Sequence, residues 1–289
     1  MTPRSWHVRG RILVLDRPRI LGILNVTPDS FSDGGKFFSA DQAIDHATRM
    51  LEDGADILDI GGESTRPQGA VPVDAEEERR RVLPVVRAMR ERFPECYLSV
   101  DTVKSDVAEA ALAAGADIIN DVSAFRLDTR MAAVCAAAGA GVILMHSRGS
   151  VQDMATYAHA SYGAEVIADV IDELVQAAGR AERGGVAHDA IALDPGIGFS
   201  KRTEHSLAVL ARLERLTAIG YPVVVGVSRK RFVGELSGVS VPAERVEGTT
   251  GANVMALAAG ARLFRVHDVL AARRALDVAW AIEQRRIMV

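Results

Sequence analysis

Polar and charged side chains lie at or just after the end of each of eight short, mainly apolar runs in this sequence. In chain order they are Asn25; Asp59 with Glu63; Asp101; Asn120 with Asp121; His146; Asp194; Ser228 with Lys230; and Arg265 with His267. Such side chains can form charge-assisted hydrogen bonds with a small, polar, anionic molecule. A single Asp or Asn after a strand is explained more simply as the cap of the next helix or the start of a turn. Capping does not explain Lys230, Arg265 and His267, so the whole set indicates a binding site.

Two polar loops follow the first two runs. Residues 27–36 include Phe31 and end beside the pair Gly34-Gly35, and residues 63–69 include Arg66. A plain surface turn would leave Phe31 and Arg66 without a role. We therefore interpret both loops as lid elements over a site.

The apolar runs that position these residues are short and rich in Ile, Val and Leu, which is typical of parallel strands buried on both faces. They lie at 20–24, 57–60, 97–100, 117–119, 142–145, 191–193, 223–227 and 263–266. Amphipathic stretches between them predict helices at 39–52, 104–114, 129–138, 164–183, 204–218 and 251–259. Glycines that end several of these stretches, such as Gly54 and Gly115, suit the close of a helix.

Eight strand-then-helix units favour a (β/α)8 TIM barrel, which brings all the carboxyl ends of its strands to one face. An open doubly wound sheet is the alternative. Its dinucleotide-binding version is weakened because no G-x-G-x-x-G follows a strand. A short N-terminal hairpin is expected from residues 6–8 and 12–15. We find no linker or low-complexity tract, so residues 1–289 are expected to form a single domain.

Composition narrows the partners and the compartment. The 289 residues carry a net charge of −4 without a long basic run, which argues against nucleic acid or an anionic membrane as the main partner. Cys96 and Cys135 are far apart, so a disulfide framework or zinc site is not expected. We find no signal peptide and no membrane span, and we expect a cytoplasmic protein.

Eight stretches together resemble the dihydropteroate synthase family. They are GILNVTPDSFSDGG at 22–35, GGESTRP at 61–67, DTVK at 101–104, IIND at 118–121, LMH at 144–146, LDPGIGF at 193–199, SRK at 228–230 and RVHD at 265–268. The resemblance spans about residues 20 to 268, and its first stretch is long and specific. It implies a pterin-binding (β/α)8 barrel and a transferase of folate biosynthesis.

The implied reaction joins 4-aminobenzoate to 6-hydroxymethyl-7,8-dihydropterin diphosphate and gives 7,8-dihydropteroate and pyrophosphate. Under this resemblance pyrophosphate would depart first, the electron-rich pterin would stabilise the methylene cation, and the aryl amine would attack. This order requires no general-base histidine to start it. The sequence agrees, since it shows no Ser/His/Asp or Cys/His set.

The resemblance also assigns residues to the pterin ring. Asp194 would accept two hydrogen bonds from the ring, while Asp101 and Asn120 would serve its remaining edge. Lys230 would donate to a ring oxygen or nitrogen. Arg265 would lay its planar guanidinium over the ring, which lysine cannot do.

The diphosphate and the metal have their own residues under the same resemblance. Thr65, Arg265 and His267 would contact the diphosphate. Asn25 would hold Mg²⁺ through its side-chain oxygen, with diphosphate oxygens and water as the other ligands. The metal would neutralise charge on the leaving group.

The two loops would form the 4-aminobenzoate pocket. Phe31 and Pro67 would flank the ring, Asp33 would face the cation, Arg66 would contact an anion, and Ser228 would meet the carboxylate. Catalytic roles are assigned to Asp33, Arg66 and Lys230. The sequence departs from the family pattern at Gln68, which resembles a one-residue insertion after Pro67.

Two other functions fit parts of the pattern. A methyltetrahydrofolate:corrinoid methyltransferase would share the ring-binding Asp and Asn residues, but it has no use for the diphosphate contacts. A catalytically silent paralogue would bind pterin without turnover. The family resemblance further implies a homodimer, for which Leu276, Trp280 and Ile282 of a predicted helix at 269–287 are candidates. Packing of this stripe against its own barrel explains it nearly as well.

Overall fold

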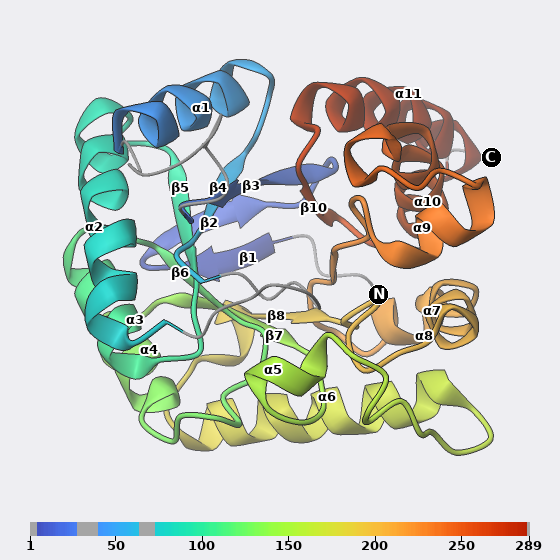
Figure 1. Cartoon of the computed structure of the whole chain (residues 1–289), viewed down its shortest axis with the longest axis horizontal. Helices are drawn as coiled ribbons and strands as arrows, with labels where there is room; N and C mark the ends of the chain where they lie inside the picture. Colours follow the sequence, from blue (N-terminus) through green and yellow to red (C-terminus); the bar gives the residue numbers. More distant parts are fainter. Residues whose placement is uncertain (1–4, 28–39, 64–72, 288–289) are drawn as a thin grey trace.

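The computed structural model describes residues 5–27, 40–63 and 73–287 of the chain. Eight parallel strands form one sheet in the order β8-β7-β6-β5-β4-β3-β10-β9. Leu193, in β8, forms a parallel bridge to Val223, beside β9, and this bridge joins the two edges of the sheet. The strands therefore close into the predicted (β/α)8 barrel, with the helices around it (Figure 1).

The strands lie close to their predicted positions. They are β3 (Arg19–Asn25), β4 (Ile57–Gly61), β5 (Tyr97–Asp101), β6 (Ile118–Asp121), β7 (Gly141–Met145), β8 (Ile191–Asp194), β9 (Val224–Val225) and β10 (Leu263–Val266). Every residue of β4, β6, β7 and β8 is buried, as expected of strands covered on both faces. Only β9 is much shorter than predicted.

Eleven α-helices lie within the described residues. They are α1 (Ala40–Glu52), α2 (Ala75–Arg92), α3 (Ser105–Ala113), α4 (Met131–Ala138), α5 (Val151–Met154), α6 (Val166–Arg183), α7 (Thr203–Leu210), α8 (Leu213–Thr217), α9 (Arg231–Ser237), α10 (Val246–Ala258) and α11 (Val269–Ile287). The single helix predicted at 204–218 is wrong, because α7 and α8 divide it. The helix α2 was not predicted, since its charged residues and Pro84 obscure a buried stripe of Val82, Val86 and Met89.

The predicted antiparallel hairpin is present, and it covers the N-terminal end of the barrel. Its strands are β1 (Ser5–Val8) and β2 (Arg11–Val14), and Trp6 pairs with Leu13 across them. Trp6, Val8, Leu13 and Leu15 pack with residues near the starts of the barrel strands, such as Ile57. The Trp6 indole N–H also donates to the Ala190 carbonyl at 2.8 Å.

The candidate stripe on α11 is only partly exposed. Leu276 is buried in the core, and Trp280 packs against that core with the Arg262 guanidinium 4.6 Å from its ring centroid. Ile282 is exposed. Packing against the chain's own barrel is therefore confirmed for Leu276 and Trp280, and the three residues do not form one exposed stripe.

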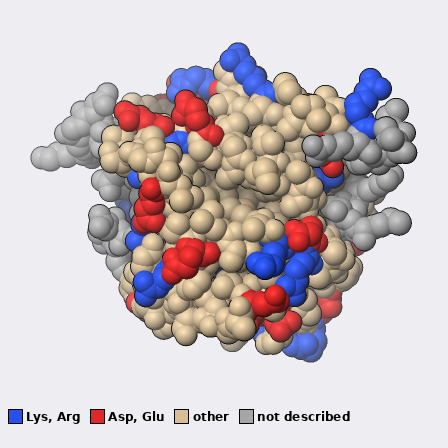
Figure 2. Space-filling model, turned by 90° about the vertical axis from the view of Figure 1, so that its right-hand side faces the viewer, with Lys and Arg blue, Asp and Glu red and all other residues tan. Residues whose placement is uncertain are grey.

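Charges are dispersed over the face on which several of the later helices lie. Figure 2 shows small groups of Lys and Arg beside Asp and Glu around a largely uncharged middle. Within the described ranges, none of the helices has the length and apolar character needed to cross a membrane. Both cysteines are free, and burial raises the pKa of each thiol to about 12, so they act as packing residues.

Candidate active site

The carboxyl ends of the barrel strands bring most of the predicted site residues to one face. Eight of these residues are described: Asn25, Asp101, Asn120, Asp194, Ser228, Lys230, Arg265 and His267. The other five, Phe31, Asp33, Thr65, Arg66 and Pro67, lie outside the described residues, as does Gln68. The roles assigned to the described and to the other site residues alike stay predictions.

Asp59, at the middle of β4, is the centre of a buried hydrogen-bond network below the mouth. Its carboxylate accepts hydrogen bonds from Ser99 Oγ at 2.5 Å and from Asn120 Nδ2 at 3.0 Å. It also accepts one from Arg265 Nε at 2.5 Å. These contacts join β4, β5, β6 and β10. The sequence marked Asp59 only as a polar residue near a strand end, and its organising role was missed.

Arg265 lies between two carboxylates. Its Nη2 donates to Asp101 Oδ2 at 2.7 Å, while its Nε is held by Asp59. Although burial disfavours a charged guanidinium, the charges of Asp59 and Asp101 raise the pKa of Arg265 above its usual value. Burial raises the pKa of Asp101 to about 7, against the lowering effect of Arg265. Arg265 thus presents a fixed positive charge at the mouth.

Asn25 ends β3 beside Asp101. A Cβ placed on Gly61, which lies between them on β4, would be 4.0 Å from Asn25 Oδ1 and 3.6 Å from Asp101 Cβ. The glycine keeps this space open. No group of three or more His, Cys, Asp or Glu side chains suited to a metal occurs in the part of the chain that the structure describes. Mg²⁺ usually has few protein ligands and takes the rest from phosphate oxygens and water, so a single side-chain oxygen such as that of Asn25 suits it.

Asp194 ends β8, Lys230 follows β9, and the two are near enough for the charge of each to affect the pKa of the other. The backbone N–H of Gly196 donates to Asp194 Oδ1 at 2.7 Å, and Lys230 Nζ donates to the Ile197 carbonyl. Lys230 Nζ also lies 4.5 Å from the centroid of the Phe199 ring. Burial lowers the pKa of Lys230 to about 8, although the charge of Asp194 opposes this effect. Burial raises the pKa of Asp194, which Lys230 opposes in turn.

The segment Ser228-Arg229-Lys230 turns sharply. Arg229 has a left-handed backbone with φ of 58°, and its side chain pairs with Asp268 at 2.9 Å. Ser228 Oγ lies 2.9 Å from His267 Nδ1 and accepts from the His267 backbone N–H at 3.1 Å. The turn therefore holds Ser228 beside His267 and places Arg229 in an ion pair with Asp268.

Three of the polar residues near strand ends have structural partners instead. Asp121 accepts hydrogen bonds at 2.6 Å from both the backbone N–H and the hydroxyl of Ser123, so it closes a turn. Glu63 pairs with Lys104 at 2.6 Å. His146 is buried against Lys201 and Glu173. For Asp121 the simpler explanation from the sequence was right.

Lys201 is the site-adjacent residue that the sequence did not reveal. It follows the stretch 193–199 by two residues and is almost fully buried. Its ammonium group contacts the loop that carries the partners of Asp194 and Lys230. A signal was present, because lysine is rare in this chain, but nothing in its local pattern indicated burial.

Comparisons with known proteins agree with this arrangement. Residues 21–267 match a family described as pterin binding enzyme. A dihydropteroate synthase of Streptococcus pyogenes serotype M3 is 44% identical over 263 residues, which cover 91% of this chain and 94% of that protein. The solved structure of Xanthomonas albilineans dihydropteroate synthase with 4-aminobenzoic acid has a TM-score of 0.89 and 44% identity, covering 98% of this chain and 99% of that one. The Thermus thermophilus enzyme in complex with 6HMPPP has a TM-score of 0.82 and 45% identity, covering 96% of this chain and 100% of that one.

Proposed function

Because this chain belongs to the dihydropteroate synthases of the pterin-binding enzyme family, we propose that it condenses 6-hydroxymethyl-7,8-dihydropterin diphosphate with 4-aminobenzoate at the mouth of its barrel. The products are 7,8-dihydropteroate and pyrophosphate. The observation that carries the proposal is the convergence of buried carboxylates, an amide and two cations from separate strands on this one face. Such a set can match the flat array of donors and acceptors of a pterin.

The pterin ring lies between the Asp194 and Asn120 sides of the mouth. Asp194 accepts from the ring's amino group and neighbouring N–H, while Lys230 donates to a ring oxygen or nitrogen. Because Asn120 Nδ2 donates to Asp59, the Asn120 amide is held in one orientation. Asp101 and Arg265 hold each other at 2.7 Å, which fixes the guanidinium that packs over the ring.

The diphosphate lies toward Thr65, Arg265 and His267. Arg265 keeps its charge because Asp59 and Asp101 stabilise it. Asn25 provides a side-chain oxygen for Mg²⁺ beside the open space over Gly61. The ion, when bound, would neutralise negative charge on the departing pyrophosphate.

The reaction is dissociative. The bond from the pterin methylene carbon to the diphosphate oxygen breaks, and the electron pair leaves with pyrophosphate. The methylene cation is stabilised by the pterin ring, with Asp33 facing it. The amine nitrogen of 4-aminobenzoate then forms the new C–N bond and releases a proton to solvent. Phe31 and Pro67 flank the benzoate ring, Arg66 contacts an anionic group, and Ser228 meets the benzoate carboxylate.

The condensation itself is the first test. Purified protein with Mg²⁺ and both substrates should yield dihydropteroate and pyrophosphate, which chromatography can follow. Excess chelator should stop product formation, and full activity in chelator would remove the metal from the proposal. Asn25→Ala should raise the Mg²⁺ concentration needed for half-maximal rate, whereas Asn25→Asp keeps an oxygen ligand as the matched control. Pterin binding without any product would favour the silent paralogue.

We further propose that the protein is a cytoplasmic homodimer. Two uncrosslinked thiols suit a reducing compartment. Helices α10 and α11 pack together and expose Met255, Val278 and Ile282, whose exposed fractions are 70%, 63% and 56%. Exposed apolar side chains that share one face of a helix, as Val278 and Ile282 do at a spacing of four residues, can mark an interface. Sedimentation equilibrium should give a dimer that Val278→Glu weakens, and a monomeric mass at micromolar concentration would contradict the proposal.

A further inference from the structure

Lysine is scarce in this chain and is placed selectively. The sequence has lysines only at positions 36, 104, 201 and 230, against thirty arginines. The three that the structure describes each follow a barrel strand at its carboxyl end. An ammonium is compact and donates three hydrogen bonds in different directions, which a planar guanidinium cannot do. The chain thus uses lysine where a compact donor is needed, and the function of Lys201 is not explained by the roles described so far.

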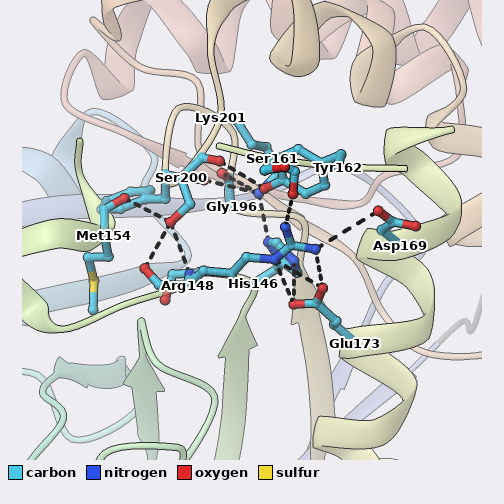
Figure 3. Close-up of polar contacts among 12 residues, drawn as sticks. His146, Arg148, Met154, Ser161, Tyr162, Asp169, Glu173, Gly196, Ser200 and Lys201 are labelled. Carbon is cyan, nitrogen blue, oxygen red and sulfur yellow. Dashed lines mark hydrogen bonds and ion pairs between the residues drawn. The ribbon is translucent and has the colours of Figure 1, made fainter. Parts of the chain in front are cut away.

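The ammonium of Lys201 has three hydrogen-bond partners inside the protein. Its exposed fraction is 1%, and its Nζ lies 2.7 Å from His146 Nδ1 (Figure 3). The same Nζ donates to the carbonyls of Gly196 and Phe199, each at 3.1 Å. Three partners match the three N–H donors of an ammonium. Burial, together with the charge of Lys230, lowers the pKa of Lys201 well below its usual value.

The turn that Lys201 contacts also carries the partners of two predicted pterin ligands. The Gly196 carbonyl accepts a hydrogen bond from Lys201, and the Gly196 backbone N–H donates one to Asp194. The next carbonyl, of Ile197, accepts from Lys230, and the Phe199 ring lies against the same ammonium. The segment 196–199 is therefore held between Lys201 on one side and Lys230 on the other.

The backbone conformation of this turn is tightly restricted. Gly196 has φ of +64°, and a Cβ on it would come within 1.9 Å of the His146 carbonyl oxygen. His146 N also donates to the Asp194 carbonyl at 2.9 Å, which ties the end of β7 to the end of β8. The position of Gly196 thus depends on close contacts with the His146 backbone and on the bond from Lys201.

Lys201 is itself anchored from behind the site. Burial, together with the charge of Lys201, lowers the pKa of His146 to about 4, so this ring is neutral near pH 7. Its Nδ1 accepts from Lys201, and its Nε2 lies 3.1 Å from Glu173 of α6 (Figure 3). Although burial raises the pKa of Glu173, the hydrogen bonds from His146 and Arg148 lower it to about 2. A charged, fixed Glu173 thus orients His146 toward Lys201.

We propose that Lys201 is a positioning residue for pterin recognition, which sets the Gly196–Phe199 turn and through it the Asp194 carboxylate and the Lys230 ammonium. The inference rests on the function proposed above. The contacts of Lys201 with the turn lead to Asp194 and Lys230, which are the predicted pterin ligands on this side of the mouth. Loss of Lys201 should therefore weaken pterin binding more than 4-aminobenzoate binding.

The test compares Lys201→Met with Tyr162→Phe. The first variant keeps the side-chain volume but removes all three hydrogen bonds of the ammonium. The second removes one hydrogen bond to the residue between this turn and Lys201, from the Tyr162 hydroxyl to the Ser200 carbonyl at 2.9 Å, and leaves the Gly196 and Phe199 carbonyls paired. Calorimetry should show pterin Kd raised roughly tenfold in Lys201→Met. In Tyr162→Phe it should change less than about twofold.

Steady-state kinetics separate positioning from general destabilisation. In Lys201→Met, the KM for pterin diphosphate should rise while the KM for 4-aminobenzoate stays within about twofold of the wild-type value. Equal increases in both, or an unchanged pterin Kd in a folded variant, would overturn the proposal. If Lys201→Met does not fold, the same measurements are made on Lys201→Gln, whose amide group has two N–H donors in place of the three of the ammonium. Failure of both to fold would make Lys201 purely structural and would also overturn it. Wild-type protein that binds pterin but forms no product would contradict the condensation alone, because calorimetry still tests Lys201.

Discussion

The two ends of the barrel are built from the same strands but differ in chemistry. At the N-terminal end, Trp6 and Leu13 of the hairpin pack against apolar residues near the strand starts, such as Ile57 and Ile118. At the C-terminal end, Asp59, Asn120 and Arg265 are joined by hydrogen bonds. Buried charges are costly unless they are paired, whereas buried apolar surface is favourable. The apolar end therefore stabilises the fold. The polar end buries charged groups at some cost to stability, and these groups are the candidates for binding.

Backbone geometry follows the same division. Five non-glycine residues in the described ranges have positive φ angles, and Arg9 in the hairpin turn is the one at the apolar end. The other four, Ala124, Phe125, Ser200 and Arg229, lie in segments that follow the carboxyl ends of β6, β8 and β9. Non-glycine residues in this region carry strain that the surrounding structure must hold. Strain is thus concentrated around the candidate active site.

The largest expected effect is at the apolar end. Trp6→Ala should lower the free energy of unfolding by about 3–5 kcal/mol, because it removes a fully buried ring from the hairpin core. Urea unfolding measures the change, and calorimetry should find pterin affinity unchanged in the folded fraction. Ile12→Ala, on the exposed side of the same hairpin, is the matched control and should change stability by less than about 0.5 kcal/mol. Loss of pterin affinity in folded Trp6→Ala would break the division between the two ends.

Asp194→Asn should give the opposite pattern. The substitution removes a charge-assisted contact worth about 1.5–3 kcal/mol, so pterin affinity should fall by roughly one to two powers of ten. Stability should change little, since the amide keeps the shape of the carboxylate and an oxygen that can accept from Gly196 N–H. Titration calorimetry on the folded variant decides the matter. An unchanged affinity would remove Asp194 from the pterin site.

Lys230 makes the polar end sensitive to pH. Its pKa is about 8, so the side chain is cationic below this value and neutral above it. Pterin diphosphate binding should therefore weaken as pH rises, by roughly tenfold between pH 8 and pH 9 and a half if the charge is required. Lys230→Arg stays cationic over this range and should lose the dependence, whatever its absolute affinity. A wild-type Kd that is constant from pH 7 to pH 9 would argue against a charged Lys230 in binding.

The smallest expected effect comes from a comparison of residues at the strand ends, which are assigned to pterin binding, with a loop residue that is assigned to 4-aminobenzoate binding. Phe31 is assigned to the 4-aminobenzoate pocket on the resemblance, and it lies outside the described residues. Phe31→Leu loses an aromatic contact of about 0.5–1.5 kcal/mol, so the KM for 4-aminobenzoate should rise roughly two- to tenfold. Pterin diphosphate affinity should stay within about twofold. Equal losses for both substrates would mean that this loop supports the whole pocket.

The sequence alone determined the fold class and most strand positions. Short runs such as Val142–Met145 are apolar throughout because parallel barrel strands are buried on both faces. It also located Asp101, Asp194, Lys230 and Arg265, since residues at or just after the carboxyl end of a barrel strand lie at the mouth. It failed at α2, where charged residues hide the buried stripe, and at 204–218, where one predicted helix is two.

Only the tertiary structure decided how those residues work together. Asp59 contacts Asn120 and Arg265 across 61 and 206 residues of sequence, and no local pattern encodes such pairs. Lys201 resembles any polar residue before a helix until the fold surrounds it with His146 and the carbonyls of Gly196 and Phe199. Helix and strand periodicities are local and can be recognised along the chain. Burial, and with it the pKa shifts of Asp101 and Lys230, is a property of the closed barrel.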